Sequence, residues 1–179
     1  MYKLEEIDRR LRLVRPGQKV LDLGAAPGSW TLYLARAVGP HGSVLAVDLH
    51  DLRSPLPANA RFLRGSSDEL LDALAAAGPF DLVVSDMAPS TIGDRATDQY
   101  RSFELFSSAV TIAARVGRDG SAFVGKIFHG PSFEEARAKL RALYVEVRVV
   151  RPRATRSESY EVFLVGQGKK TGATGPTIG

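Results

Sequence analysis

Apolar residues recur along this chain in two alternating patterns, which predict strands and helices in turn. Short apolar runs predict buried strands, whereas apolar residues every three or four positions predict amphipathic helices. The expected strands are 20–23, 43–48, 61–64, 81–85, 121–127, 145–150 and 160–165, and the expected helices are about 2–14, 30–37, 68–77, 97–116 and 133–143. Such alternation is typical of an α/β protein with a mostly parallel sheet and helices on both faces.

The segment between the last two predicted strands, residues 151–159, contains no predicted helix. Parallel strands need a long crossover, usually a helix, so a direct connection predicts that the last strand is antiparallel. We therefore expect a seven-stranded sheet that is parallel except for its last strand. Residues 1–168 are expected to form one domain, and the Gly-, Thr- and Lys-rich residues 169–179 a disordered tail.

Composition narrows the class of protein. A length of 179 residues with 44% hydrophobic residues suits one domain with its own core. Cysteine is absent and the three histidines are scattered, which excludes disulfides, thiolate nucleophiles and cysteine-based zinc sites. No apolar run approaches the length of a membrane span. We expect a cytoplasmic monomer that needs neither a metal nor a membrane.

Positive charge gathers near the two ends of the chain. The formal net charge is only +4, but acidic residues concentrate between 68 and 104 while arginines crowd the first and last parts. Arg137 and Arg141 fit ordinary solvated positions of an amphipathic helix. Arg151, Arg153 and Arg156 lie in the segment before the last strand with little compensating acid, so we expect these three to bind the phosphates of a polyanion.

A glycine-rich turn follows the first predicted strand, in the segment 20–30. Gly24 and Gly28 allow backbone conformations closed to other residues, but Ala25, Ala26 and Pro27 crowd the turn, so it is not the GxGxxG loop that binds a pyrophosphate. The second strand ends in Asp48, about twenty residues later, where a carboxylate can accept hydrogen bonds from ribose hydroxyls. A plain strand-turn-helix with a solvated Asp48 is the alternative.

Together, this turn and this acid resemble the first two motifs of Rossmann-like, S-adenosylmethionine-dependent methyltransferases. In an open parallel sheet, ligands bind beyond the carboxyl ends of the strands. Two strands place Asp86 and Lys126 there, and because the last strand is antiparallel, its first residues, with Glu161, lie at the same edge. Lys3, at the start of the first helix, can complete the group. A competing acid, Glu158, falls outside the strand pattern.

Several spaced motifs resemble the FtsJ/RrmJ family of ribosomal RNA 2′-O-methyltransferases over nearly the whole chain. They are Tyr2–Ile7, Asp22–Gly28 with Trp30, Ser85–Pro89, Gly125–Phe128, and Arg151–Arg156 leading to Glu161. The resemblance implies S-adenosylmethionine as cofactor, 2′-O-methylation of large-subunit ribosomal RNA at a uridine, and the large ribosomal subunit as partner. With RNA as the substrate, Arg151, Arg153 and Arg156 are expected to bind its phosphates. The resemblance also implies that Lys3, Asp86, Lys126 and Glu161 are a catalytic tetrad, and that Gly24, Gly28, Trp30, Asp48, Ser66 and Asp86 contact the cofactor.

The chemistry explains these residue types. A ribose hydroxyl is a poor nucleophile until a group holds it in line with the methyl group and accepts its proton, and Lys126 is our candidate for that base. A lysine pKa near 10.4 must then be lowered by burial, by the sulfonium charge and by Lys3. Asp86 and Glu161 act in the opposite direction, so we expect them to orient the lysines and the ribose.

Two features depart from the family pattern. Ser66 stands where relatives place an acid that contacts the adenine, so either Asp68 takes over that contact or cofactor affinity is reduced. Relatives also carry a basic arm before Tyr2. A shortened sequence and dependence on a structured ribosomal subunit are the two explanations for its absence here.

Three other functions compete with ribosomal RNA methylation. The same tetrad could methylate transfer RNA or a messenger RNA cap, because specificity lies in the RNA-binding surface. A catalytically silent RNA-binding assembly factor could keep the fold, but the intact tetrad argues against it. A small-molecule methyltransferase would not need an arginine-rich segment beside its active site.

Overall fold

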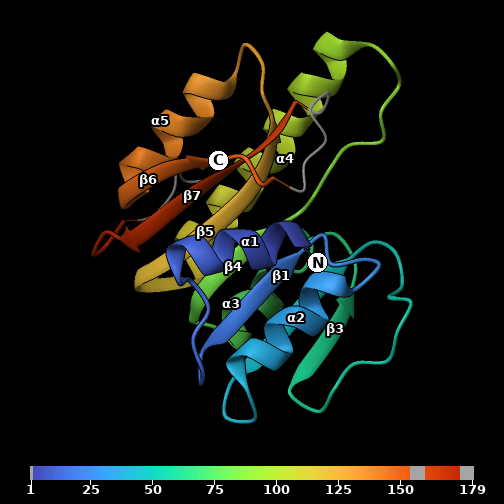
Figure 1. Cartoon of the computed structure of the whole chain (residues 1–179), viewed down its shortest axis with the longest axis vertical. Coiled ribbons are helices and arrows are strands. Elements are labelled where there is room, and N and C mark those ends of the chain that lie inside the picture. Colours follow the sequence, from blue (N-terminus) through green and yellow to red (C-terminus); the bar gives the residue numbers. More distant parts are fainter. Residues whose placement is uncertain (1, 154–159, 174–179) are drawn as a thin grey trace.

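The computed structural model, which describes residues 2–153 and 160–173, is built on a seven-stranded sheet with strand order β3-β2-β1-β4-β5-β7-β6 (Figure 1). The strands are β1 (Lys19–Leu23), β2 (Ser43–Asp48), β3 (Ala60–Arg64), β4 (Phe80–Ser85), β5 (Gly117–Phe128), β6 (Tyr144–Val150) and β7 (Glu161–Lys169). The helices are α1 (Tyr2–Leu11), α2 (Ser29–Val38), α3 (Leu71–Ala77), α4 (Arg95–Val116) and α5 (Phe133–Leu143). The predicted order of elements is confirmed.

The last strand is antiparallel, as the short connection predicted. β7 lies between β5 and β6 and pairs with both in antiparallel register, whereas β1 to β5 pair with one another only in parallel. The Rossmann-like fold is therefore confirmed. The strand order changes direction at β1 and β4, which is the point in an open sheet where ligands bind.

The sheet separates two apolar cores because successive strand residues point to opposite faces. Leu21 and Leu23 pack with residues of α3, α4 and α5, whereas Val20 packs with residues of α1 and α2. Figure 1 shows α1 and α2 together on one side of the sheet. Helix α1 is anchored there by Leu4 and Ile7, both fully buried, which fixes the position of its first turn.

Several boundaries differ from the sequence predictions for local reasons. Helix α1 ends at Leu11, because Arg12 adopts φ 53° and Asp8 Oδ1 accepts the backbone N–H of Val14. Strand β5 begins earlier than expected, and a register shift between Phe80 and Leu82 of β4 accommodates the extra residues. Tyr100 continues the apolar spacing of Phe103 and Phe106 in α4, which predicts that it points into the core, but the residue is 56% exposed.

The far end of β7 also extends beyond the expected strand. Lys169 is its last residue, is buried, and donates from Nζ to the Gly117 carbonyl oxygen at 2.8 Å. The rest of the expected tail includes residues 174–179, which lie outside the described residues. No helix in the described part of the chain is both long and apolar enough to cross a membrane.

Candidate functional site

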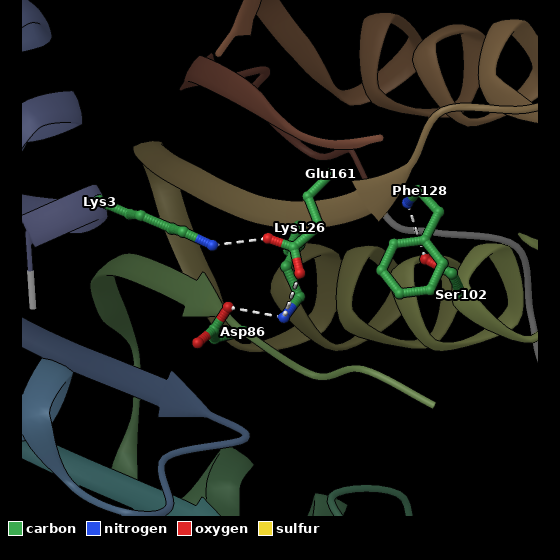
Figure 2. A network of polar contacts seen from close by, with 6 residues as sticks. All are labelled: Lys3, Asp86, Ser102, Lys126, Phe128 and Glu161. Carbon is green, nitrogen blue, oxygen red and sulfur yellow. Dashed lines mark hydrogen bonds and ion pairs between the residues drawn. The ribbon is translucent and has the colours of Figure 1, made fainter. Parts of the chain in front are cut away.

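Four ionisable side chains from α1, β5, β7 and the loop after β4 meet at one edge of the sheet (Figure 2). Lys3 Nζ donates to Glu161 Oε2 at 2.6 Å. Lys126 Nζ lies 3.1 Å from Asp86 Oδ1 and 3.9 Å from Glu161 Oε1. Glu161 thus bridges the two lysines, and the four residues singled out from the sequence form one continuous network.

Strand register explains why these residues converge. Ser85, the last residue of β4, pairs with Leu23 on one side and Gly125 on the other. Asp86 and Lys126, the residues that follow Ser85 and Gly125, therefore lie side by side. In the antiparallel pair, Glu161 of β7 is opposite Phe128, two residues beyond Lys126. The antiparallel direction of β7 is therefore what brings its first residue to this edge.

The network is largely shielded from water. The Lys126 side chain is only 11% exposed, compared with 33% for Lys3. Burial raises the pKa of Asp86, the ion pair with Lys126 opposes that rise, and the negative charge of Glu161 adds to it. The ion pair with Lys126 thus favours the charged form of Asp86 at this depth.

A cavity of about 670 Å³ adjoins the network and shares Asp86 with it. Its wall includes residues just beyond the carboxyl ends of four neighbouring strands, namely Gly24 after β1, Asp48 at the end of β2, Ser66 after β3, and Asp86 after β4. Asp68 also lines it. A cavity of this size suits a small-molecule ligand, and Asp86 joins it to the ionisable network.

The turn after β1 has the tight geometry that its glycine predicted. Gly24 adopts φ 70°, and a Cβ there would lie 2.8 Å from Met87 Cγ and 2.9 Å from the Met87 backbone nitrogen. The backbone N–H groups of Gly24 and Ala25 both donate to the Val47 carbonyl oxygen. The turn is therefore held against the neighbouring strand and leaves the cavity open.

Asp48 organises the loops around it as well as facing the cavity. Its Oδ2 accepts the Ala26 N–H at 2.9 Å and its Oδ1 accepts the His50 N–H at 2.8 Å. A carboxylate oxygen can accept more than one hydrogen bond, so both oxygens retain capacity for hydroxyl donors of a ligand.

Gly28 and Trp30 do not line this cavity. Gly28, with φ 119°, is the N-cap of α2 and makes no side-chain cap. Trp30 is 5% exposed and packs against Phe163, with ring centroids 5.9 Å apart. Its place in the first turn of α2 turns the indole into the apolar core between α2 and the sheet.

Asp22 is a buried acid that the sequence interpretation treated only as part of a motif. It is fully buried in β1, and Thr31 Oγ1 donates to its Oδ2 at 2.7 Å. Its Oδ1 has no hydrogen-bond partner among the described residues. Burial raises its pKa to about 7, and the negative charges of Asp86 and Asp48 contribute. The sequence signal that indicates such a buried acid is a charged residue inside the apolar run 20–23.

The arginine-rich segment begins beside α1. Arg151 and Arg153 are exposed, and the Arg153 N–H donates to Glu6 Oε1 of α1 at 2.9 Å. Arg156, the third arginine expected to bind RNA, lies outside the described residues, as does Glu158. The contact with Glu6 nonetheless brings the basic residues from both ends of the chain to one region.

We searched the described residues for groups of side chains that could bind a metal ion. Across residues 2–153 and 160–173, no group of three or more His, Asp or Glu side chains could hold a metal ion.

Comparisons with known proteins agree with this architecture. The sequence model of a family described as FtsJ-like methyltransferase matches residues 1–169. A Sorangium cellulosum protein named ribosomal RNA large subunit methyltransferase E is 51% identical over 177 residues, which cover 98% of this chain and 84% of that protein.

Two solved structures share the fold at low sequence identity. A Plasmodium falciparum protein that carries the name ribosomal RNA methyltransferase has a TM-score of 0.79 and 23% identity, covering 94% of this chain and 95% of that one. Aeropyrum pernix fibrillarin with bound S-adenosyl-L-methionine has a TM-score of 0.65 and 16% identity, covering 86% and 68%.

Proposed function

Because this chain belongs to the FtsJ-like methyltransferase family, we propose that it transfers a methyl group from S-adenosylmethionine to a ribose 2′-hydroxyl of large-subunit ribosomal RNA. The observation that carries the proposal is the network of Lys3, Glu161, Lys126 and Asp86 at the end of the cavity. The choice of substrate rests on the name of the 51% identical relative. Uridine as the target nucleotide stays a prediction of the family resemblance.

The described residues fit the cofactor. Asp48 presents carboxylate oxygens to the cavity, as a ribose diol requires, and the absence of a side chain at Gly24 keeps that wall open. Helix α2 begins without a side-chain cap and without an acid in its first turn, so its N-terminus can attract a carboxylate. Asp22 Oδ1 is a buried acceptor that lacks a donor among the described residues, and the cofactor carries an ammonium group.

Lys126 is the candidate base. When bound, S-adenosylmethionine supplies a methyl group on a positively charged sulfur. Lys126 Nζ lies 3.1 Å from Oδ1 of Asp86, which lines the cavity. There it can accept the proton that the 2′-hydroxyl loses as its oxygen takes up the methyl group and the bond from that methyl group to sulfur breaks. A base held in this way contributes about 10²- to 10⁴-fold to rate.

The remaining three residues fix the position of that base. Asp86 and Glu161 hold Lys126 from two sides, and Lys3 holds Glu161 from the far side, so that the nitrogen cannot swing away from the cavity. The contribution of these contacts to the reaction is to orient groups.

RNA would approach along the surface that carries Arg151 and Arg153. Both guanidinium groups are exposed, and the Arg153 backbone is fastened to α1, the helix that contributes Lys3. Phosphate contacts by arginine position RNA without reading its sequence, whereas the 2′-hydroxyl that accepts the methyl group is present in RNA and absent from DNA.

The direct test is transfer of labelled methyl from S-adenosylmethionine to large ribosomal subunits that lack 2′-O-methylation. Free ribosomal RNA, transfer RNA and capped messenger RNA are assayed in parallel. Label on the large subunit or its RNA supports the proposal. Label on transfer RNA or capped RNA alone would change the substrate, and cofactor binding without any transfer would favour a silent binding protein.

A further inference from the structure

A small cluster of one arginine and two aromatic rings lies beside the ionisable network and has no role in it. The Arg95 guanidinium carbon lies 5.2 Å from the centroid of the Tyr160 ring. The Tyr160 ring meets the Phe128 ring edge to face, with centroids 5.0 Å apart. Arg95 is exposed and Tyr160 half-buried, while Phe128 is buried beneath them.

The chain segments that deliver the network also deliver this cluster. Tyr160 directly precedes Glu161, and Phe128 pairs with Glu161 across β5 and β7. Figure 2 shows Phe128 beyond Lys126 and Glu161, on the side away from Lys3. Arg95 begins α4, at the end of the loop that starts with Asp86. A polynucleotide whose ribose lies at Lys126 therefore passes close to this cluster.

Backbone hydrogen bonds hold the cluster in place. The Tyr160 carbonyl oxygen accepts the His129 N–H at 2.8 Å, and the Phe128 N–H donates to Ser102 Oγ at 2.9 Å, as drawn in Figure 2. The buried Asp98 carboxylate accepts the N–H groups of Ile92 and Gly93, which precede Arg95 in the chain. These hydrogen bonds fix the backbone around the two rings and Arg95 before any ligand binds.

Arg95 is also available for a ligand. Among the described residues, no carboxylate lies within ion-pair distance of its guanidinium group, in contrast to Arg9, Arg10 and Arg64. An exposed guanidinium over an aromatic ring offers a planar, positively charged surface. Proteins that bind single-stranded RNA stack its bases on such guanidinium and aromatic planes.

We propose that Arg95 and Tyr160, supported by Phe128, form a stacking site for an unpaired base of the RNA substrate next to the ribose that is methylated. The inference rests on the proposed function, because it requires RNA to reach Lys126. It assigns to this edge a contact with a base, in addition to the phosphate contacts expected of Arg151 and Arg153.

Substitutions that separate charge from planarity test the proposal. We would measure kcat and KM for methyl transfer to ribosomal RNA with wild type, Tyr160→Leu, Tyr160→Phe, Arg95→Ala and Arg95→Lys. Tyr100→Leu, the same change at an exposed tyrosine elsewhere on α4, is the matched control. Binding of S-adenosylhomocysteine, measured by calorimetry, verifies that each variant is folded.

A stacked base predicts a loss in kcat/KM of about 5- to 150-fold for Tyr160→Leu. Tyr160→Phe keeps the ring and is expected to regain most of that loss. Arg95→Lys keeps the charge but not the plane, so it is expected to resemble Arg95→Ala. Affinity for S-adenosylhomocysteine is expected to be that of the wild type in every variant.

Three results would overturn the stacking site while leaving the proposed function intact. These are wild-type kcat/KM in Tyr160→Leu, an equal loss in Tyr100→Leu, and full recovery in Arg95→Lys, which would indicate a phosphate contact. If the wild-type protein itself transfers no methyl group to RNA, the proposed function fails first and the stacking site falls with it.

Discussion

Lys3 and Glu161 are separated by 158 positions in the sequence, yet Lys3 Nζ and Glu161 Oε2 are 2.6 Å apart. This contact joins the first turn of α1 to the first residue of β7, and Glu161 extends the link to Lys126. Neither end of the chain is sufficient to form the site, because α1 supplies one lysine and β7 supplies the acid that positions the other.

Glu161→Gln is expected to lower the rate of methyl transfer about 10- to 100-fold, because the side chain would no longer hold both lysines by charge. Glu158→Gln is the matched control, because Glu158 is the alternative acid for this role in the sequence. Glu158 lies outside the described residues. Initial rates under saturating RNA and S-adenosylmethionine would measure the effect. A larger loss in Glu158→Gln than in Glu161→Gln would reverse the assignment.

Asp48→Asn is expected to weaken S-adenosylhomocysteine binding about 10- to 150-fold, because hydrogen bonds to a charged acceptor are lost. Asp51→Asn provides the control, since Asp51 is an exposed acid in the same loop that pairs with Arg64 instead. Isothermal titration calorimetry gives both affinities. Equal affinities in the two variants would remove Asp48 from the cofactor site.

Asp68 and Ser66 both line the cavity, so either can contact the adenine of the cofactor. Asp68 Oδ1 accepts from Ser108 Oγ at 2.8 Å, which holds the carboxylate in place. Since a carboxylate is the stronger acceptor, we expect Asp68→Asn to weaken S-adenosylhomocysteine binding about 10-fold and Ser66→Ala by less. The opposite order, measured by the same calorimetry, would make Ser66 the principal contact.

Asp22 predicts a pH dependence of stability. Its pKa is about 7 in the folded protein compared with an ordinary value of 3.8, so the folded state binds its proton more tightly. The stabilisation is complete below pH 3.8 and is lost as the pH rises through about 7. The full effect is on the order of 4 kcal/mol.

Asp22→Asn is expected to remove this part of the pH dependence while keeping the fold. Free energies of unfolding from denaturant titrations, measured at several pH values across the window, give the difference between the two proteins. Parallel pH profiles for wild type and Asp22→Asn would show that Asp22 does not titrate in this range.

Much of the fold was predictable because the apolar periodicity of each element matches its final environment. The direction of the last strand followed from a short connection, and that direction placed Glu161 beside Lys126. The direction of the Trp30 side chain was not predictable. Its motif indicated the cavity, but sequence spacing does not show which way a side chain turns from the first turn of a helix, and Trp30 turns into the core.

Tyr100 and Tyr160 illustrate a second limit. Tyr100 fits the apolar spacing of α4, yet it lies beyond the edge of the packed face and is exposed. Tyr160 belongs to a strand end, and nothing in its local sequence indicates that Arg95 and Phe128 will surround it. Such three-way contacts depend on tertiary packing of segments that are distant in the chain.

If Lys126 accepts the proton of the ribose hydroxyl, Lys126→Ala removes the base of the reaction. We would measure single-turnover methyl transfer to large ribosomal subunits together with S-adenosylhomocysteine affinity, with Lys139→Ala, an exposed lysine of α5, as control. If Lys126 is the base, the rate of Lys126→Ala is expected to be about 10²- to 10⁴-fold below wild type, with cofactor affinity retained. Wild-type rates in Lys126→Ala would contradict it.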